Sequence, residues 1–251
     1  MLYNLIGDPH GRDVWKKLVR EDAINIFLGD YLDPYPSDNL QAGIDDWGNL
    51  QEILKYKQTH ANTVLLLGNH DLHYIWHEHY SRYNVMHAAK YEEFFLRHWS
   101  EFQAAYAIGN NILVTHAGVS PDWCKIAGIP IDGEHEVNAQ KLAERICEYV
   151  NDRNRWHWLM TKYTFGVYDT CGMSSTASPI WIRPQALIST MDVQNPAFMR
   201  ITQVVGHTQT NEIFQAENLV FIDCLGKTCS SLIIDVAEDG SYTLTIHQPE
   251  L

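Results

Sequence analysis

The chain has 251 residues, and its 18 lysines and arginines against 31 aspartates and glutamates give a formal net charge of −13 at pH 7. Generic nucleic-acid binding needs a basic surface that neutralises backbone phosphates, so this charge disfavours a DNA- or RNA-binding protein. Apolar residues make up 45% of the sequence and charged residues 20%, which is typical of a globular protein. We therefore expect a single α/β domain spanning residues 1–251.

The sequence also lacks the features of membrane and secreted proteins. It has no apolar stretch of the roughly 20 residues that a membrane span requires, and its start lacks the regions of a signal peptide. The five cysteines are odd in number and none is spaced as C-x-x-C, so neither a disulfide framework nor a thiolate zinc site is indicated. These features predict a cytoplasmic protein without a membrane partner.

Short apolar runs alternate with longer amphipathic segments along most of the chain. Runs of this length predict buried strands, and they are residues 2–6, 24–28, 63–67, 111–115 and 201–205. Apolar residues at helical spacing predict helices over 40–54, 88–104 and 136–150. Strands alternating with helices indicate βαβ units and hence an α/β fold.

The last part of the chain has a different pattern. Three strand-like segments, 219–224, 231–236 and 242–247, follow one another closely, and Asp239-Gly240 is a hairpin turn signal. We expect them to form an antiparallel meander that closes the chain.

Each of the five apolar runs ends in a small residue followed at once by a side chain that can bind a metal ion. The pairs are Gly7-Asp8, Gly29-Asp30, Gly68-Asn69, Thr115-His116 and Gly206-His207. Ligands of α/β sheets bind beyond the carboxyl ends of the strands, so we expect these five side chains to meet in one crevice. With His10 they supply three oxygen donors and three imidazoles, enough for two metal ions when one carboxylate bridges them. A single pair of this kind is usually only a turn, but five at successive strand ends indicate a site.

These motifs resemble, in the same order, the signature blocks of the calcineurin-like metallophosphoesterases, most closely the phosphoprotein phosphatase branch. The blocks are Gly7-Asp8-Pro9-His10-Gly11, Gly29-Asp30-Tyr31-Leu32-Asp33, Gly68-Asn69-His70-Asp71, Thr115-His116-Ala117-Gly118 and Gly206-His207-Thr208. The resemblance implies a four-layer α/β/β/α sandwich with mixed sheets and a dinuclear metal centre. It implies one ion on Asp8, His10 and Asp30. It implies a second ion on the bridging Asp30 with Asn69, His116 and His207, and Asn69 would also face the substrate phosphate.

The resemblance further implies catalytic roles for two residues. In the phosphoprotein phosphatases the His after the Asn is a general acid, and an Asp three residues beyond the bridging one orients it; His70 and Asp33 stand at these places. The implied reaction is hydrolysis of phosphate monoesters, including phosphoserine or phosphothreonine in proteins, by direct attack of a metal-bridging hydroxide. His70 would protonate the leaving alkoxide while Asp33 fixes its tautomer.

The donor types bear on the metal and on the branch of the superfamily. Carboxylate, imidazole and amide ligands without a thiolate suit Mn²⁺, Fe, Co²⁺ or Zn²⁺, and we expect Mn²⁺ first among them. The nuclease-like branches have a second ligand His where this chain has Gln209, which favours ligation of the phosphatase type.

One residue of the family pattern is missing. The family block continues Asp-Arg-Gly, with the Arg clamping the substrate phosphate, but this chain has Asp33-Pro34-Tyr35. Residues 179–183 resemble the segment that supplies a second phosphate-binding Arg in bacterial members, so Arg183 is our candidate for binding substrate phosphate. An arginine suits this role because its planar fork binds two phosphate oxygens at once. Further candidates for the lost clamp are Arg12, Arg153 and Arg155.

Other interpretations stay open at this point. Residues 68–73 and 115–123 look like symmetrical diadenosine tetraphosphatases of the same family, which would make the chain a dinucleoside-polyphosphate hydrolase. The altered clamp at Pro34 is compatible with a noncatalytic metal-binding scaffold, and a metal-dependent nuclease is disfavoured by the net charge and Gln209. The remaining histidines, His73 and His77 among them, are expected to be helix or surface residues rather than ligands. Aromatic residues within 155–181 would stack on a nucleobase or fill the core.

Overall fold

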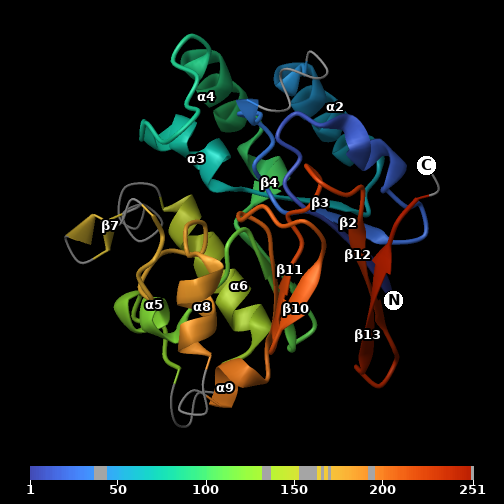
Figure 1. The fold of residues 1–251 in the computed structure, drawn as a ribbon, viewed down its shortest axis with the longest axis vertical. Coiled ribbons are helices and arrows are strands. Elements are labelled where there is room, and N and C mark those ends of the chain that lie inside the picture. Colours follow the sequence, from blue (N-terminus) through green and yellow to red (C-terminus); the bar gives the residue numbers. More distant parts are fainter. Residues whose placement is uncertain are drawn as a thin grey trace. The chain divides into compact units, whose positions relative to one another are not determined.

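The computed structural model describes residues 1–36, 44–131, 137–152, 163–164, 167–168, 171–191 and 196–249. The chain divides into two compact units, and each is built from more than one stretch of sequence. The first unit comprises Met1–Gln103, Gln209–Ile213 and Ile222–Leu251, and the second comprises Ala104–Thr208 and Phe214–Phe221. Each unit contains one large mixed sheet with its own helices, as in the metallophosphoesterase fold (Figure 1). The single domain expected over residues 1–251 stays a prediction.

The first unit contains a six-stranded sheet in the order β13-β12-β1-β2-β3-β4. Its parallel part consists of β1 (Leu2–Ile6), β2 (Ile24–Phe27), β3 (Thr63–Leu66) and β4 (Phe102–Gln103). The hairpin β12 (Ser231–Val236) and β13 (Tyr242–His247) joins β1 antiparallel. The helical segments of this unit are η1 (Asp13–Lys17), α2 (Asp46–Thr59), α3 (Asn69–Trp76), α4 (Ala88–Arg97) and η2 (Trp99–Glu101).

The second unit contains a five-stranded sheet in the order β10-β11-β9-β6-β5. The strands are β5 (Ala105–Ile108), β6 (Ile112–Thr115), β9 (Thr202–Val205), β10 (Phe214–Ala216) and β11 (Leu219–Phe221). β6, β9 and β11 run parallel and are buried along their whole length. The helices are α5 (Pro121–Ile126), α6 (Ala139–Asn151), α8 (Pro184–Thr190) and α9 (Pro196–Met199). β7 (Tyr163–Thr164) and β8 (Val167–Tyr168) form a separate antiparallel pair.

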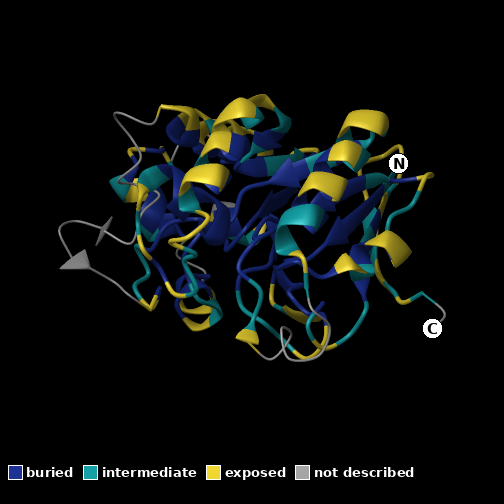
Figure 2. Cartoon of the chain, turned by 90° about the horizontal axis from the view of Figure 1, so that it is seen from above, coloured by how far each residue is buried: buried dark blue, intermediate teal, exposed yellow. Residues whose placement is uncertain are grey.

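All five strands expected from apolar runs are present, as β1, β2, β3, β6 and β9. Their residues are nearly all buried, which explains why they are mostly apolar rather than alternating. In Figure 2 the strands are mostly dark blue, while the helices carry yellow, exposed stretches. This pattern agrees with helices that bury one face, such as α6, which packs against β5 and β6 and buries Leu142 and Ile146.

Two of the three expected helices differ from the prediction. α2 begins at Asp46 because the Asp45 side chain accepts the Gly48 N–H at 2.9 Å as an N-cap, and the helix continues to Thr59. Residues 40–43 of the expected helix lie outside the described residues. The segment 88–104 is α-helical only to Arg97. The short helix η2 follows, and Phe102 and Gln103 then pair with β3 as the strand β4. The helix expected over 136–150 is confirmed as α6.

The predicted C-terminal meander is wrong for its first strand. β11 does not pair with β12, because β9 and β10 take up both of its edges in the other sheet. Only the β12–β13 hairpin with its turn at Asp239-Gly240 forms as expected. Closeness in sequence suggested a pairing that the three consecutive buried residues of β11 do not support, since they suit a central strand.

Two expected absences concern membranes and disulfides. None of the helices within the described residues has the length and apolar character needed to cross a membrane. The five cysteines, all within the described residues, form no disulfide bond. Cys124 and Cys224 are buried, whereas Cys171 is exposed.

Candidate metal and catalytic site

The carboxyl ends of β1 and β2 bring Asp8, His10 and Asp30 together within the first unit. Each is buried, and their ligand atoms all lie within 4.8 Å of one another. His10 Nδ1 lies 2.8 Å from the Leu32 carbonyl oxygen, so Nδ1 donates and Nε2 keeps its lone pair. Burial lowers the pKa of His10 to about 3, which keeps the imidazole in the neutral form that binds metals. This buried set of carboxylates and an imidazole fits one divalent ion of the kind that the sequence predicts.

Several predicted site residues have a left-handed backbone conformation, which residues other than glycine rarely adopt. The φ angles are 44° for His10, 56° for Asp30, 59° for Asp33 and 65° for His207. A residue held in this region costs of order 1–3 kcal/mol. Such strain gathers where a fold must aim side chains at a ligand, and here it marks the motif residues.

Glycines allow the loops after β2 and β3 to touch. A Cβ on Gly68 would lie 2.1 Å from Asp30 Oδ1, and one on Gly29 would lie 2.4 Å from the Gly68 nitrogen. Asp71 fastens the two loops, because its carboxylate accepts the N–H groups of Gly68 (2.8 Å), Asp30 (2.8 Å) and Tyr31 (3.1 Å). Burial and the nearby Asp30 raise the pKa of Asp71 to about 8, while these three donors act in the opposite direction.

The start of α3 carries the next two predicted site residues, Asn69 and His70. Gly68 is the N-cap of this helix, so both residues lie in its first turn and are buried. The His70 N–H donates to Asp30 Oδ1 at 2.8 Å, which fixes the helix start against the predicted bridging carboxylate. The β3–α3 junction therefore positions both side chains relative to Asp30.

Asp33 is buried and contacts three polar side chains of α3. His70 Nδ1 donates to Asp33 Oδ2 at 2.8 Å, and His73 Nε2 lies 2.9 Å from the same oxygen. The Tyr74 hydroxyl donates to the other oxygen, Oδ1. Burial acts to raise the pKa of Asp33, but the contacts with His70 and His73 bring it below its ordinary value. An ionised Asp33 thus holds the His70 proton on Nδ1 and leaves Nε2 for other partners.

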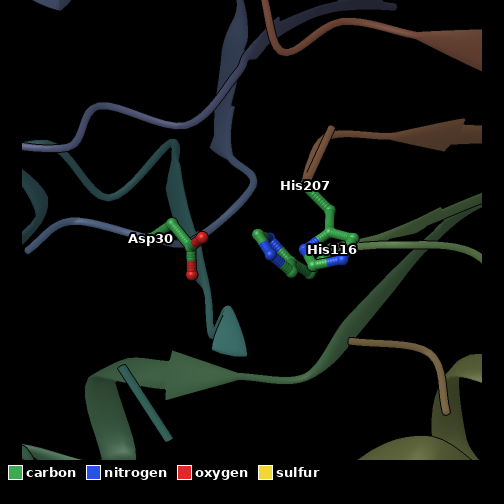
Figure 3. A group of neighbouring side chains, drawn as sticks. All are labelled: Asp30, His116 and His207. Atoms are coloured by element: carbon green, nitrogen blue, oxygen red, sulfur yellow. The ribbon is translucent and has the colours of Figure 1, made fainter. Parts of the chain in front are cut away.

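His116 and His207 lie together in the second unit, at the ends of the neighbouring parallel strands β6 and β9. Their ring centroids are 5.1 Å apart, and both side chains are buried. His207 Nε2 lies 3.1 Å from the Trp181 carbonyl oxygen, so Nε2 donates there and Nδ1 keeps its lone pair. Figure 3 draws both histidines together with Asp30, which follows β2.

The five motif strands do not share one sheet. β1, β2 and β3 belong to the six-stranded sheet, whereas β6 and β9 belong to the five-stranded one. The motif residues therefore follow strands of two sheets, and the expectation that all five side chains meet in one crevice stays a prediction. The alternation of strands and helices gives the order of elements, but strand pairing depends on contacts that are distant in sequence.

The candidate phosphate-binding arginines lie in different places. Arg183 is the N-cap residue of α8, and its Nη1 donates to Thr208 Oγ1 (3.0 Å) and to the His207 carbonyl oxygen (3.3 Å). Arg12 is buried in the first unit, with Nη1 3.3 Å from the Asp8 carbonyl oxygen. Arg153 and Arg155 lie outside the described residues, as does most of the aromatic stretch that begins at residue 155.

Two residues next to His70 were missed by the sequence analysis. His73 was expected to be an ordinary helix residue, yet it is fully buried against Asp33. Its spacing of three residues from His70 places both on one helical face, which is a signal that the sequence does contain. Arg82, in the segment between α3 and α4, has Nη2 3.0 Å from His70 Nε2. No motif or periodicity marks Arg82.

A comparison with models of known protein families identifies the family of this chain. The model of the calcineurin-like phosphoesterases matches residues 3–180, well over half of the chain. The chain belongs to the calcineurin-like phosphoesterase family. The family works with a dinuclear metal centre, so this phosphoesterase is a metal-dependent phosphatase with candidate ligands at the positions described above.

Solved structures of two phosphatases have a similar fold. A cold-active protein-tyrosine phosphatase of the psychrophile Shewanella sp. is 16% identical, with a TM-score of 0.59 over 97% of this chain and 80% of that one. A protein serine/threonine phosphatase from Saccharomyces cerevisiae is 13% identical, with a TM-score of 0.56 over 100% of this chain and 81% of that one. Comparison with curated proteins gives no match.

Proposed function

We propose that this phosphoesterase hydrolyses phosphate monoesters, with phosphoserine and phosphothreonine side chains of proteins as the substrate class. The observation that carries the proposal is the His70–Asp33 pair, 2.8 Å apart, in the same unit as the buried Asp8, His10 and Asp30. A monoester of an aliphatic alcohol has a poor leaving group, so its hydrolysis needs both charge neutralisation and a proton donor. These two groups of residues offer both functions.

The proposed ligands form two sets. Asp8, His10 and Asp30 would hold one divalent ion, and Asp30, Asn69, His116 and His207 would hold a second. Support comes from the buried group Asp8, His10 and Asp30, from the His116–His207 pair and from membership of the family. The donor set suits Mn²⁺ first, with Fe, Zn²⁺ and Co²⁺ as alternatives.

Bound divalent ions supply a water of lowered pKa and neutralise charge on the phosphate oxygens. The chain itself must orient the ester and deliver a proton to the leaving oxygen. His70 does this through Nε2, because Asp33 keeps the other nitrogen protonated and stabilises the imidazolium. Tyr74 and His73 hold Asp33 in turn, so the acid is aimed by side chains that are themselves buried.

Arg183 is proposed to bind the substrate phosphate. We expect Arg183→Ala to raise KM for phosphomonoesters and to lower kcat while metal content stays unchanged, since a phosphate contact acts in both the ground state and the transition state. Steady-state kinetics and metal analysis check this, with Arg200→Ala, an exposed arginine of the same unit, as the control. Loss of metal in Arg183→Ala would instead show that Arg183 positions the loop of His207, whose carbonyl oxygen it contacts.

A substrate panel tests the proposed reaction. The protein loaded with Mn²⁺ is assayed for phosphate release from phosphoserine and phosphothreonine peptides, from mononucleotides and from p-nitrophenyl phosphate, and for cleavage of diadenosine tetraphosphate. We expect phosphopeptides to have the highest kcat/KM. Preference for diadenosine tetraphosphate would support the dinucleoside-polyphosphate alternative, and inactivity on every substrate would support a binding scaffold.

We further propose a cytoplasmic location. The absence of disulfides among five cysteines supports it, because thiols persist in reducing compartments.

A further inference from the structure

The segment between α3 and α4 brings a positive charge to the atom that delivers the proton. Arg82 Nη2 lies 3.0 Å from His70 Nε2, and Nη1 donates to the Asp33 carbonyl oxygen. A guanidinium has only hydrogen-bond donors, so in this contact Arg82 donates to His70 Nε2. The contact places Arg82 at the nitrogen through which His70 is proposed to act.

The Arg82 guanidinium lies over the aromatic ring of Tyr35. Its Cζ lies 3.9 Å from the centroid of the Tyr35 ring, close enough for a cation–π contact. The same ring meets the His10 ring edge-on, with centroids 5.0 Å apart, and the rings of His10 and His70 are 5.4 Å apart. Tyr35 thus places Arg82 among a proposed metal ligand and the proposed acid.

The backbone conformation of Arg82 favours a role in ligand binding over that of an ordinary surface arginine. Its φ of 66° is in the left-handed region, where an arginine is strained. Its side chain bonds inward to His70 and to the Asp33 carbonyl, although the chain offers many surface carboxylates as partners. A strained backbone and a side chain directed toward His70 are typical of a residue that binds a ligand.

Charge points to the kind of ligand. Asp8, Asp30 and Asp33 lie buried in this unit, in a chain with a net charge of −13, so a phosphate dianion approaching them needs a nearby cation. Arg82 offers a planar fork that can bind two phosphate oxygens. Arg12 is further from the Tyr35 ring, at 5.5 Å, and its Nη1 is directed to backbone carbonyls.

We infer that Arg82 binds the phosphate of the substrate and releases His70 when it does so. In the substrate-free protein the guanidinium rests on His70 Nε2; when a phosphate monoester binds, the fork moves to the phosphate oxygens. This movement takes the guanidinium off His70 Nε2, the nitrogen that faces the leaving oxygen in the proposed reaction. The inference rests on the proposed function of the His70–Asp33 pair.

Binding of inorganic phosphate, the reaction product, tests this role directly. The Mn²⁺-loaded wild type, Arg82→Ala and Arg82→Lys are titrated with phosphate by calorimetry, with metal content measured on the same samples. Losing a charge-assisted contact to phosphate weakens binding roughly 10–100-fold. We expect that loss in Arg82→Ala, a smaller loss in Arg82→Lys, unchanged metal content, and a raised KM for p-nitrophenyl phosphate.

Controls separate this role from a structural one. Arg97→Ala removes an exposed arginine of α4 that pairs with Glu93, and it should leave phosphate binding unchanged. Tyr35→Leu should weaken phosphate binding more than Tyr35→Phe, because only Phe keeps a ring beneath the guanidinium.

The failures are distinguishable. If the wild type neither hydrolyses p-nitrophenyl phosphate nor binds phosphate, the proposed function itself is wrong. If the wild type does both and folded Arg82→Ala binds phosphate as tightly, only the role of Arg82 is overturned.

Discussion

Asp30→Asn is expected to reduce the binding of both metal ions, because Asp30 is the residue proposed to bridge them. Asparagine has nearly the same size and tolerates the left-handed backbone at this position, where φ is 56°, so the fold should persist. The loss of activity should exceed the roughly 10–100-fold that removal of a group outside the ligand set costs. Metal analysis and phosphate release measured on the same sample check both effects.

Two comparison variants sharpen the Asp30 result. Asn69→Ala should weaken one of the two ions preferentially, because Asn69 is assigned to one site only. Asp22→Asn, which removes an exposed carboxylate paired with Arg20, should change neither metal content nor activity. A full wild-type metal complement in Asp30→Asn would show that Asp30 is not the bridge.

His70→Asn should keep the metals and lose kcat by about 10²–10⁴-fold, the usual contribution of one positioned acid or base. The loss must depend on the leaving group. An alkyl phosphate releases a strongly basic alkoxide that needs a proton, whereas p-nitrophenolate leaves readily without one. The loss should therefore be much larger on phosphoserine esters than on p-nitrophenyl phosphate, in kinetics measured side by side.

Neighbouring variants identify the cause of the His70 effect. Asp33→Asn should show the same dependence on leaving group in milder form, because it removes the orienting partner rather than the acid. His77→Asn is a matched control: His77 is exposed at the end of α3 and has a left-handed φ of 56°, which asparagine tolerates. Equal losses of His70→Asn on both substrates would remove His70 from the acid role, and loss of metal would make it a ligand.

Local sequence predicted the strands of the fold better than their arrangement. The apolar runs located β1, β2, β3, β6 and β9 to within a residue or two, because a buried parallel strand must be apolar along its length. Which strands pair was not accessible. β11 joins the sheet of β9 instead of forming a meander with β12. Phe102 pairs beside β3 in the strand β4, although its aromatic neighbours suggested a helix.

The candidate site shows the same division. Glycine followed by a residue that can bind metal marked Asp30 and Asn69, and the structure explains these glycines by the close approach of the loops at Gly29 and Gly68. Arg82 could not be found in this way, since 12 residues separate it from His70 and its contact depends on the path of the α3–α4 segment. The left-handed backbone of the motif residues was equally hidden, because tertiary contacts impose it on side chains that ordinarily avoid it.

The most direct test of the dinuclear phosphatase is a metal titration of the wild type. The protein is freed of metal with a chelator and titrated with Mn²⁺, while bound metal and phosphate release from a phosphoserine peptide are measured together. We predict no hydrolysis by the metal-free protein, and activity that reaches its maximum only as the bound metal approaches two ions per chain. Full activity in the metal-free protein, or a maximum at one bound ion per chain, would contradict it.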